Sequence, residues 1–409
     1  MRILFLTPYL PYPPNKGTAL RNLYIIRDAA RSHPTRLLTF AGEADREAVE
    51  VLSRDLEGVE VAAPPGRSML QRLAGLPSTQ PDLAARLRSP ELHEKLVKTL
   101  EAGGIDLVQV EGLEMAPYAM EICRRRGSAR KPLVLYDAHN AEYALQRSAC
   151  RTDLASPARW PGAMYSLLQW RKLRAYEREV CRQADGVLAV SEADAAILRA
   201  LEPGLNPRVI PNGVDTDSFG YRSSASRPDA GRYNLVFTGT LDYRPNVDAA
   251  VWFCRQILPL VRRDCPSAHL LLVGRSPAPA VRSLAGPAVT VTGPVEDVRP
   301  YLYENSVFVA PLRMGSGTRL KILEAMSCGL PVVSTTIGME GIAATAGQEA
   351  LIADEPAAFA ASVLELLSDP ARAHSLATRA RLLAEHHYDW TAILPELAKV
   401  YRELGNTPA

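Results

Sequence analysis

The sequence predicts an α/β protein made of two domains, each a parallel sheet flanked by helices. Short apolar runs rich in β-branched residues alternate with longer stretches of helical periodicity, a pattern typical of βαβ units. The pattern occurs twice, because five such runs end at Val190 and a new set begins at Leu235. The chain has 409 residues, 47% of them hydrophobic and 22% charged, which is enough for two cores at about 150 residues per domain.

The expected strands fall into two groups separated by a linker. The first group is 2–7, 36–40, 107–110, 133–136 and 186–190. The second group is 235–238, 269–273, 289–292, 307–310 and 332–334. Between them, residues 219–233 are dominated by Ser, Arg, Pro, Asp and Gly without an apolar period, as expected of a linker.

These groups define the expected domains. We expect a first domain over residues 1–205, an interdomain linker over 206–234 and a second domain over 235–385. The final segment, 386–409, contains an apolar stripe at helical spacing from Trp390 to Leu404 that must be buried. We assign this helix to a return onto the first domain, although the sequence is equally compatible with a helix that closes its own domain.

Composition excludes several classes of function. Lys and Arg (47) nearly balance Asp and Glu (45), so the formal charge of +2 does not favour nucleic acid as a partner. No apolar stretch reaches the roughly 18 residues of a membrane span, and the six scattered cysteines are typical of a reducing cytosol. No His, Cys and carboxylate cluster at ligand spacing implies a metal. We expect a cytoplasmic protein without metal or cofactor, and the basic run 124–131 leaves contact with the inner face of a membrane open.

The most informative segment is 311–331, which follows an expected buried strand and opens a helix. Gly315 and Gly317 allow the backbone to approach a ligand closely. At the expected helix start, free amides form a seat for an anion, together with the neighbouring Ser316. These are the amides of Thr318, Arg319 and Leu320.

Two cationic side chains and one acid belong to the same segment. Arg319 and Lys321 add fixed positive charge, which a diphosphate needs in place of a metal ion. Glu324 lies three residues after Lys321, on a neighbouring strip of the helix. Its carboxylate is suited to accept both hydroxyls of a ribose. The alternative is a simple ion pair with Lys321 in solvent.

Residues 321–333 resemble the donor-site motif of the retaining GT-B glycosyltransferases of family 4. Residues 209–215 resemble that family's interdomain Pro-Asn-Gly-Val-Asp motif, and 184–191 the strand before it, so the similarity spans nearly the whole chain. The resemblance implies two Rossmann-like domains whose parallel sheets face each other across a cleft. It also implies a nucleotide diphosphate-sugar donor in the second domain, an acceptor in the first, and retention of the anomeric configuration.

The chain departs from the family pattern at two places. Members carry a first glutamate eight residues before the second, and Ser316 stands at that position here. The loop 239–246 has Thr240 and Pro245 where the family commonly has an Arg and a Lys for phosphate. We expect Arg319 and Lys321, with Arg244 nearby, to supply the missing charge.

The first domain offers two further candidates. Gly17, where a loop leads into a helix expected from Thr18 to Ser32, resembles the family's glycine beside the donor phosphate, and Lys16 adds charge. An ordinary βα loop is the alternative. His139 follows an expected strand, at the carboxyl end where open sheets hold ligands. It matches the family's cleft histidine, which implies a hydrogen bond to the donor sugar, although a lone histidine is often structural.

The sequence therefore predicts a hexosyltransferase that moves a sugar from a nucleotide diphosphate-sugar onto an unidentified acceptor hydroxyl. The acceptor could be a lipid-linked glycan. By analogy with the family, we expect the transfer to belong to cell-surface polysaccharide synthesis. A sugar-nucleotide epimerase of the same fold and a degenerate nucleotide-sugar-binding protein remain alternatives. The expected catalytic residues are His139, Arg319, Lys321 and Glu324. The expected donor-binding residues are Lys16, Gly17, Arg244, Ser316, Gly317, Thr318 and Leu320.

Overall fold

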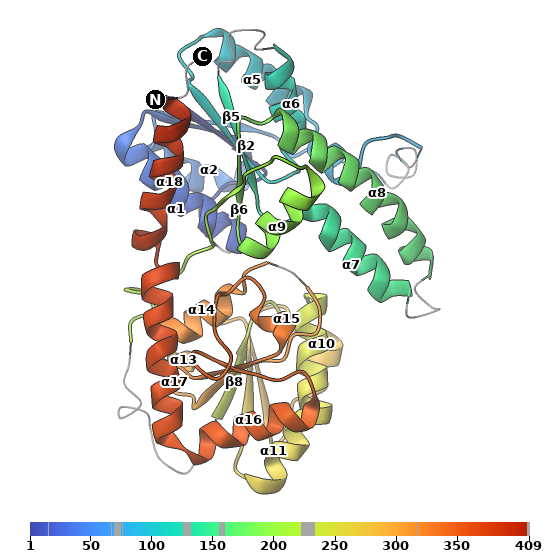
Figure 1. Cartoon of the computed structure of the whole chain (residues 1–409), viewed down its shortest axis with the longest axis vertical. Helices are drawn as coiled ribbons and strands as arrows, with labels where there is room; N and C mark the ends of the chain where they lie inside the picture. Colours follow the sequence, from blue (N-terminus) through green and yellow to red (C-terminus); the bar gives the residue numbers. More distant parts are fainter. Residues whose placement is uncertain are drawn as a thin grey trace. The chain divides into compact units, whose positions relative to one another are not determined.

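The computed structural model describes residues 1–14, 16–66, 68, 75, 77–125, 132–154, 160–221, 234–315 and 317–406. The chain divides into two compact units, shown in Figure 1. The first unit consists of Met1–Pro211 and Leu394–Ala409, and the second of Asn212–Ile393. No helix of the described residues is long and apolar enough to cross a membrane.

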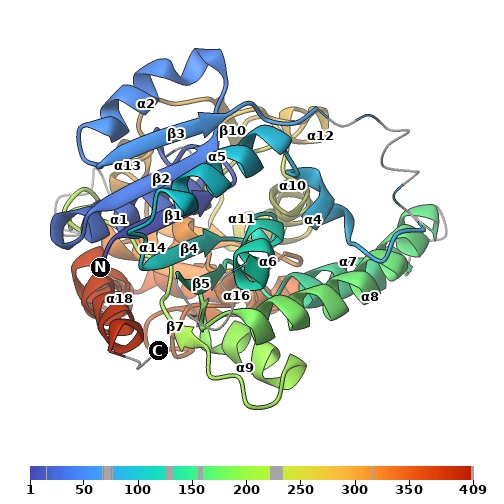
Figure 2. The ribbon, with the colours of Figure 1, turned by 90° about the horizontal axis from the view of Figure 1, so that it is seen from above.

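The first unit is built on a seven-stranded parallel sheet in the order β3-β2-β1-β4-β5-β6-β7. Its strands are β1 (Ile3–Thr7), β2 (Thr35–Phe40), β3 (Gly58–Ala62), β4 (Leu107–Glu111), β5 (Leu133–Ala138), β6 (Gly186–Ala189) and β7 (Arg208–Val209). All five strands expected here are present. Figure 2 shows this sheet from above, with helices on both of its faces.

The second unit is built on a six-stranded parallel sheet in the order β10-β9-β8-β11-β12-β13. Its strands are β8 (Asn234–Thr238), β9 (His269–Val273), β10 (Val289–Gly293), β11 (Val307–Ala310), β12 (Val332–Ser334) and β13 (Leu351–Ile352). The five expected strands are again present. The predicted fold class, α/β with two parallel sheets, is confirmed.

Three strands were not predicted, and all three lie at sheet edges. They are β3, β7 and β13. β3 is mostly half-buried, while β7 and β13 have only two residues each. An edge strand packs against fewer neighbours than a central one, so it does not need the continuous apolar run that identifies a buried parallel strand.

Helices connect the strands in sequence, as parallel pairing requires. In the first unit they are α1 (Gly17–Ser32), α2 (Arg46–Ser53), α4 (Asp82–Arg86), α5 (Pro90–Glu101), α6 (Ala116–Arg125), α7 (Glu142–Leu154), α8 (Trp160–Gln183) and α9 (Glu192–Leu201). In the second unit they are α10 (Arg244–Trp252), α11 (Leu258–Asp264), α12 (Pro279–Arg282), α13 (Arg299–Tyr303), α14 (Leu320–Ser327), α15 (Thr336–Met339), α16 (Pro356–Ser368) and α17 (Pro370–Leu383).

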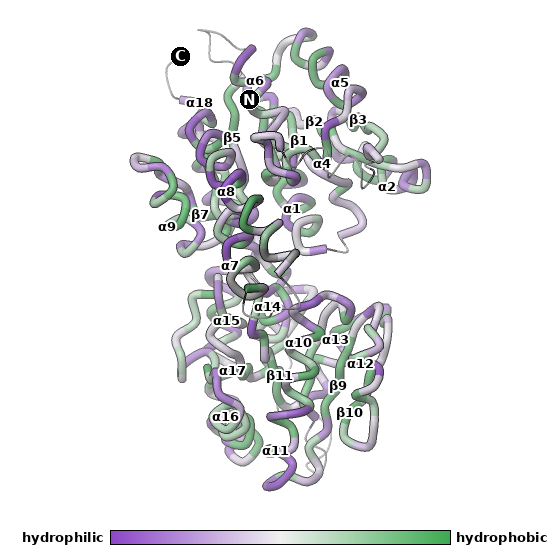
Figure 3. The backbone as a smooth tube through the Cα atoms, turned by 90° about the vertical axis from the view of Figure 1, so that its right-hand side faces the viewer, coloured by the Kyte–Doolittle hydropathy of each residue, from purple (hydrophilic) through white to green (hydrophobic). Residues whose placement is uncertain are grey.

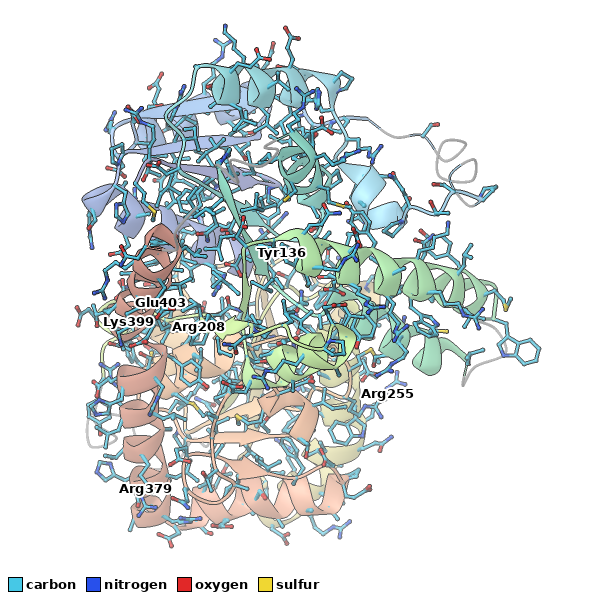
Figure 4. The ribbon with its side chains drawn as sticks, turned by 45° about the horizontal axis from the view of Figure 1, so that its top comes forward. Tyr136, Arg208, Arg255, Arg379, Lys399 and Glu403 are labelled. Carbon is cyan, nitrogen blue, oxygen red and sulfur yellow. The ribbon has the colours of Figure 1, made fainter. Side chains whose placement is uncertain are left out.

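The last helix, α18 (Trp390–Gly405), is divided between the two units after Ile393. In the first unit, the buried Tyr401 hydroxyl donates a 2.6 Å hydrogen bond to Gln109 Oε1 of β4. On the surface, Arg208 of β7 pairs with Glu403 at 2.7 Å, and both are labelled in Figure 4. Figure 3 shows purple stretches on this helix and a mostly green β5, as expected of an amphipathic helix and a core strand.

The segment that follows β7 is held within the second unit. Val214 N donates to Tyr388 O at 2.7 Å, and Thr216 donates from both its amide and its hydroxyl to Asp389 Oδ2. The expected linker begins at residue 206, whereas the division between units falls after Pro211. Most of the polar run 219–233 lies outside the described residues.

Candidate functional site

In the second unit, the candidate site forms where the strand order of the sheet reverses. β8 is the first strand of this sheet, with β9 on one side and β11 on the other. The loop after β8 leads into α10, and the loop after β11 leads into α14. Both loops therefore leave the carboxyl edge of the sheet at the switch point, the usual ligand position in open α/β folds.

The turn before α14 depends on its glycines. Gly315 and Gly317 have φ values of 106° and 79°, in the left-handed region that other residues rarely adopt. A Cβ atom on Gly315 would lie 3.2 Å from Arg319 Nη2, so the turn also brings this guanidinium against the backbone. Arg319 Nη1 donates a 2.8 Å hydrogen bond to Gly317 O.

The helix itself begins slightly later than the sequence predicts. Arg319 is the N-cap, with non-helical φ and ψ of −85° and 86°, and Leu320 is the first helical residue. The amides of Leu320 and Lys321 are therefore the ones in the first turn, whereas that of Thr318 lies against Gly341, 3.2 Å from the position of a Cβ there. The turn is longer than predicted because the positive φ values of Gly315 and Gly317 are incompatible with a right-handed helix.

Lys321 is desolvated against groups that carry no charge. Its Nζ donates a 2.9 Å hydrogen bond to Asn246 Oδ1 and lies 4.3 Å from the centre of the Phe237 ring. Burial lowers the pKa of Lys321 to about 7; neighbouring Arg319 acts in the same direction, and Glu324 acts in the opposite one. The site thus holds an amine poised to become fully cationic when an anion approaches.

Gly239 makes room for this amine. A Cβ atom there would lie 2.5 Å from Lys321 Nζ and 2.8 Å from Asn246 Nδ2, so no other residue fits without displacing them. Asn246 is held in turn, because its Nδ2 donates a 2.8 Å hydrogen bond to Thr240 O. The roles of Asn246 and Gly239 escaped the sequence analysis. The available signal was a glycine directly after a strand, followed by a polar residue in the first turn of the next helix.

Glu324 lies on the same helix in a partly buried environment. Burial raises the pKa of its carboxyl group to about 7, against the opposing effect of Lys321. Most of α14 is packed in the core, including Ile322, Leu323 and Met326. Since Lys321 bonds to Asn246, a simple ion pair of Glu324 with Lys321 in open solvent does not describe this site.

Arg319 and Arg244 are the other predicted cations of the second unit. Burial lowers the pKa of Arg319, while Glu340 and Tyr243 act in the opposite direction. Arg244 is exposed at the first position of α10, and the adjacent Pro245 is 3.6 Å from the position of a Cβ on Gly315. Arg244 therefore lies next to a residue that packs against the turn before α14. Ser316 lies outside the described residues.

In the first unit, Gly17 is the first residue of α1 and the exposed Lys16 is its N-cap. Lys16 Nζ lies 5.1 Å from the centre of the Tyr9 ring, within cation–π range. Both residues lie where the loop after β1 enters α1, and β1 is flanked by β2 on one side and β4 on the other. This loop again leaves the sheet at its switch point.

His139 follows β5 and bonds to the end of β4. Its Nε2 lies 2.8 Å from Glu111 Oε2, and Gln109 Nε2 donates a 2.7 Å hydrogen bond to the other oxygen of Glu111. Burial raises the pKa of Glu111, and Asp137 raises it further. Burial alone would lower the pKa of His139, but Glu111 and Asp137 outweigh it and raise the pKa. The protonation of the two groups is therefore linked through this contact.

A second buried pair lies beside this one. The guanidinium of Arg21 donates two hydrogen bonds to Asp137, at 3.0 and 3.1 Å, and both side chains are almost fully buried. Arg21 Nη1 also donates to Ile210 O and Pro211 O, at 2.9 and 3.0 Å. Arg21 was not predicted as a site residue, and its position in the first helix gives no local signal of a partner 116 residues away.

The side chains of Glu111, Asp137 and His139 offer ligand atoms within 4.8 Å of one another, which is a spacing that can hold a metal ion. However, Arg21 engages both oxygens of Asp137, and Glu111 bonds directly to His139. A cation would have to compete with that guanidinium for the same carboxylate. The cluster does not fit a metal site well, and metal independence stays a prediction.

Comparison with known families places both units. The family described as "Glycosyl transferases group 1" matches residues 232–369, and the family described as "Glycosyltransferase Family 4" matches residues 29–218. The first match lies in the second unit, and the second match lies in the first unit except for its last residues, 212–218. They contain β8 and α14 in one case and β4 and β5 in the other.

Curated relatives match parts of the chain. An uncharacterized 44.6 kDa protein in the cps region of Klebsiella pneumoniae is 26% identical over 180 residues, covering 42% of this chain and 46% of that protein. A phosphatidyl-myo-inositol mannosyltransferase of Propionibacterium freudenreichii is 29% identical over 244 residues, covering 58% of this chain and 60% of that protein. The chain thus spans about half the length of the curated relatives it matches.

Solved structures share the fold over the whole chain. Sucrose-phosphate synthase from Thermosynechococcus elongatus has a TM-score of 0.72 and 18% identity, with full coverage of both chains. Anabaena HepE in complex with UDP-glucose has a TM-score of 0.64 and 17% identity, covering 98% of this chain and all of that one. These likenesses establish the fold, which is the predicted GT-B architecture.

Proposed function

Because the chain belongs to the group 1 glycosyl transferases of family 4, we propose that it is a hexosyltransferase that takes its sugar from a nucleoside diphosphate-sugar. The observation that carries this proposal is Lys321, whose amine is desolvated beside Asn246 and Phe237 at the switch point of the second sheet. A diphosphate brings the negative charge that this amine and Arg319 are placed to meet. The likeness to HepE, which was solved with UDP-glucose, supports a donor of this class.

The proposed chemistry is electrostatic. When the bond between sugar and diphosphate breaks, negative charge grows on the leaving phosphate. Arg319, Lys321 and the first-turn amides of α14 stabilise that charge more in the transition state than in the ground state, which is what accelerates the reaction. The amine of Lys321 bonds to the neutral amide of Asn246, so it keeps charge to offer a diphosphate against the opposing effect of Glu324.

The other predicted residues position the donor. Glu324 accepts the ribose hydroxyls, and the mid-range pKa of its carboxyl group permits it to be ionised in the complex. In the first unit, His139 offers a hydrogen bond to a sugar hydroxyl from a ring held by Glu111. In a retaining transfer the acceptor hydroxyl attacks the face from which the diphosphate leaves, and the leaving phosphate accepts its proton.

The biological context of the transfer is part of the proposal. A relative encoded in a cps region supports a role in the synthesis of a surface polysaccharide, and a relative named as a phosphatidyl-myo-inositol mannosyltransferase supports a lipid-borne acceptor. The epimerase alternative is not favoured, because the second of these relatives and both family models are transferases by name. A degenerate binding protein would require the buried cations to hold a nucleotide without turnover.

The experiment is an assay of nucleotide release and sugar transfer with UDP-glucose and GDP-mannose, comparing wild type with Arg319→Ala. We expect Arg319→Ala to reduce kcat/KM by about 10²–10³, as removal of one oxyanion-stabilising group does. Arg313→Ala is the matched control, because Arg313 lies in the same loop but pairs with Asp248 at 2.7 Å. Equal activity of wild type and Arg319→Ala would contradict the proposal.

The same reactions separate the alternatives and test retention. An epimerase would release an altered nucleotide-sugar without an acceptor product, whereas a binding protein would shift its melting temperature with nucleotide and release nothing. For a transferase, the anomeric coupling of the new linkage in a proton NMR spectrum reports the configuration. An inverted product would overturn the retaining part of the proposal and leave glycosyl transfer intact.

A further inference from the structure

The helical hairpin α7–α8 of the first unit has an unusual surface. The two helices run side by side in Figures 1 and 2, and their free ends extend away from the sheet of the same unit. Most of the large apolar side chains exposed in the described residues gather at this end. They are Leu154, Trp160, Met164, Tyr165 and Leu168, with exposed fractions of 50%, 57%, 61%, 42% and 39%.

In the first turns of α8 the usual distribution of side chains is inverted. Ser166 and Gln169 are buried, at 6% and 5% exposed, although they are polar. Gln169 Oε1 accepts a 2.9 Å hydrogen bond from Asp82 N, which explains why this face is turned inward. The opposite face presents Met164 and Leu168 to the outside, four residues apart on one stripe. A surface helix usually buries its apolar side chains and exposes its polar ones, which is the opposite of this arrangement.

Cations follow the apolar stripe along the same helix. Arg171 lies eleven residues after Trp160, which is about three helical turns, so both side chains are on the same stripe. Leu168 lies three residues before Arg171 on this stripe. Residues 160–176 contain no acidic residue, and 142–176 contain six Arg or Lys against two acids. One of those two, Glu142, is largely buried, and burial raises the pKa of its carboxyl group to about 7. The exposed end is therefore apolar at its tip and cationic behind it.

We propose that the free end of the α7–α8 hairpin docks on a bilayer that contains anionic lipids. Trp160 and Tyr165 are the side-chain types that settle at the boundary between headgroups and acyl chains, with Met164 and Leu168 beside them. Arg171 then lies at the height of the phosphates, where a long cationic side chain keeps its charge in the polar layer. This inference concerns a surface of the first unit and does not depend on the proposed glycosyl transfer.

A second copy of the chain is a poorer occupant for this surface. A stable interface uses roughly 20–30 residues on each side, many more than the five exposed apolar side chains here. Two copies joined through this end would also bring their Arg171 and Arg174 groups together, and both are exposed. Charge repulsion opposes such a pair, whereas anionic headgroups complement it.

The experiment is flotation of the full chain with vesicles made either of phosphatidylcholine alone or of equal parts phosphatidylcholine and phosphatidylglycerol. We expect binding to the anionic vesicles that weakens as salt is raised, and much less binding to phosphatidylcholine. The triple variant Trp160→Ser, Met164→Ser, Leu168→Ser should bind the anionic vesicles at least about tenfold more weakly, since it removes the apolar contacts. Arg171→Glu should weaken binding and reduce the salt dependence.

Leu382→Ser is the matched control, because Leu382 is a 46% exposed leucine of α17 in the second unit and should leave vesicle binding unchanged. Melting temperatures establish that every variant is folded. Equal binding of wild type and the triple variant would overturn the proposal, and so would a concentration-dependent dimer in gel filtration that the triple variant abolishes. Donor binding measured without vesicles is a separate readout, so failure here is distinguishable from failure of the proposed function.

Discussion

Each unit contains a cation withdrawn from water, and the two are compensated in different ways. Arg21 of the first unit is 1% exposed and makes a bidentate pair with Asp137, which is fully buried. Lys321 of the second unit bonds to the neutral amide of Asn246 and faces an aromatic ring. Burial lowers the pKa of Lys321 to about 7, so that half of the molecules carry a neutral amine at pH 7.

The difference separates a structural charge from one available for binding. A buried ion pair with all its hydrogen bonds satisfied has nothing left to offer a ligand, and breaking it leaves an uncompensated charge. A desolvated amine with a neutral partner gains an interaction only when an anion arrives. The contrast supports the proposal that the second unit binds a diphosphate, while Arg21 and Asp137 join α1 to the end of β5, directly before His139.

The largest effect should come from breaking the compensated pair. Arg21→Met should destabilise the first unit by about 3–5 kcal/mol, because Asp137 would remain buried without its partner. Chemical denaturation followed by circular dichroism measures this loss. Arg27→Ala is the control on the same helix: Arg27 is 40% exposed in its pair with Asp55, so about 0–1 kcal/mol is expected. Similar losses for the two variants would show that Arg21 is not the structural charge described here.

The complementary variant should spare the fold and remove binding. Lys321→Met deletes a desolvated amine, and Glu324, which then loses the charge that lowers its pKa, can keep its proton, so we expect a melting temperature equal to or above that of the wild type. The thermal shift produced by UDP-glucose or GDP-mannose should disappear, and kcat/KM should fall by about 10²–10³. A variant that keeps both the shift and the activity would show that Lys321 plays no part in binding the donor.

The sequence predicted the repeating and buried parts of this molecule well. All ten expected strands are present, because parallel strands covered on both faces require apolar runs that are visible locally. The Gly-rich turn and its cations were also identified, since glycine at Gly315 and Gly317 marks backbone conformations that other residues avoid. These features are encoded within a few consecutive residues.

What escaped prediction depends on partners distant in the chain. Arg21 meets Asp137 across 116 residues, and Lys321 meets Asn246 across 75, so neither pairing has a local signature. The onset of α14 at Leu320 also differed, because Arg319 is turned toward Gly317 O instead of entering the helix. Such contacts are decided by which loops the sheet order brings together.

The amine of Lys321 should also make donor binding depend on pH. With a pKa of about 7 in the free protein, Lys321 is charged below pH 7 and must take up a proton to bind an anion above it. The affinity for UDP-glucose, whose diphosphate has no further proton to lose in this range, should therefore fall by up to about tenfold per pH unit above pH 7. Titration calorimetry in two buffers of different ionisation enthalpy should detect proton uptake at alkaline pH.

Lys321→Arg provides the matched control for that titration. Arginine stays charged throughout this range, so the uptake linked to residue 321 should vanish and the affinity should lose most of its slope above pH 7. Glu324→Gln tests the second group, because burial raises the pKa of Glu324 to about 7 as well. Proton uptake that persists in Lys321→Arg and disappears in Glu324→Gln would assign the linkage to the carboxyl group.

The smallest effect should come from changing Glu111, which pairs with His139 in the first unit. Glu111→Gln removes the carboxylate bonded to His139 Nε2 at 2.8 Å, so the pKa of His139 should fall because burial then dominates. The histidine ring resonances in NMR spectra report this change, and kcat/KM should decline by about tenfold or less, consistent with a positioning residue. Glu114→Gln is the control, because Glu114 lies beside Gly112 at the same turn, whereas the carboxylate that bonds to His139 is that of Glu111. If Glu111→Gln left the pKa of His139 unchanged or raised it, Glu111 would not be the group that raises this pKa. The only compensated charge shown for the first unit would then be that of Arg21.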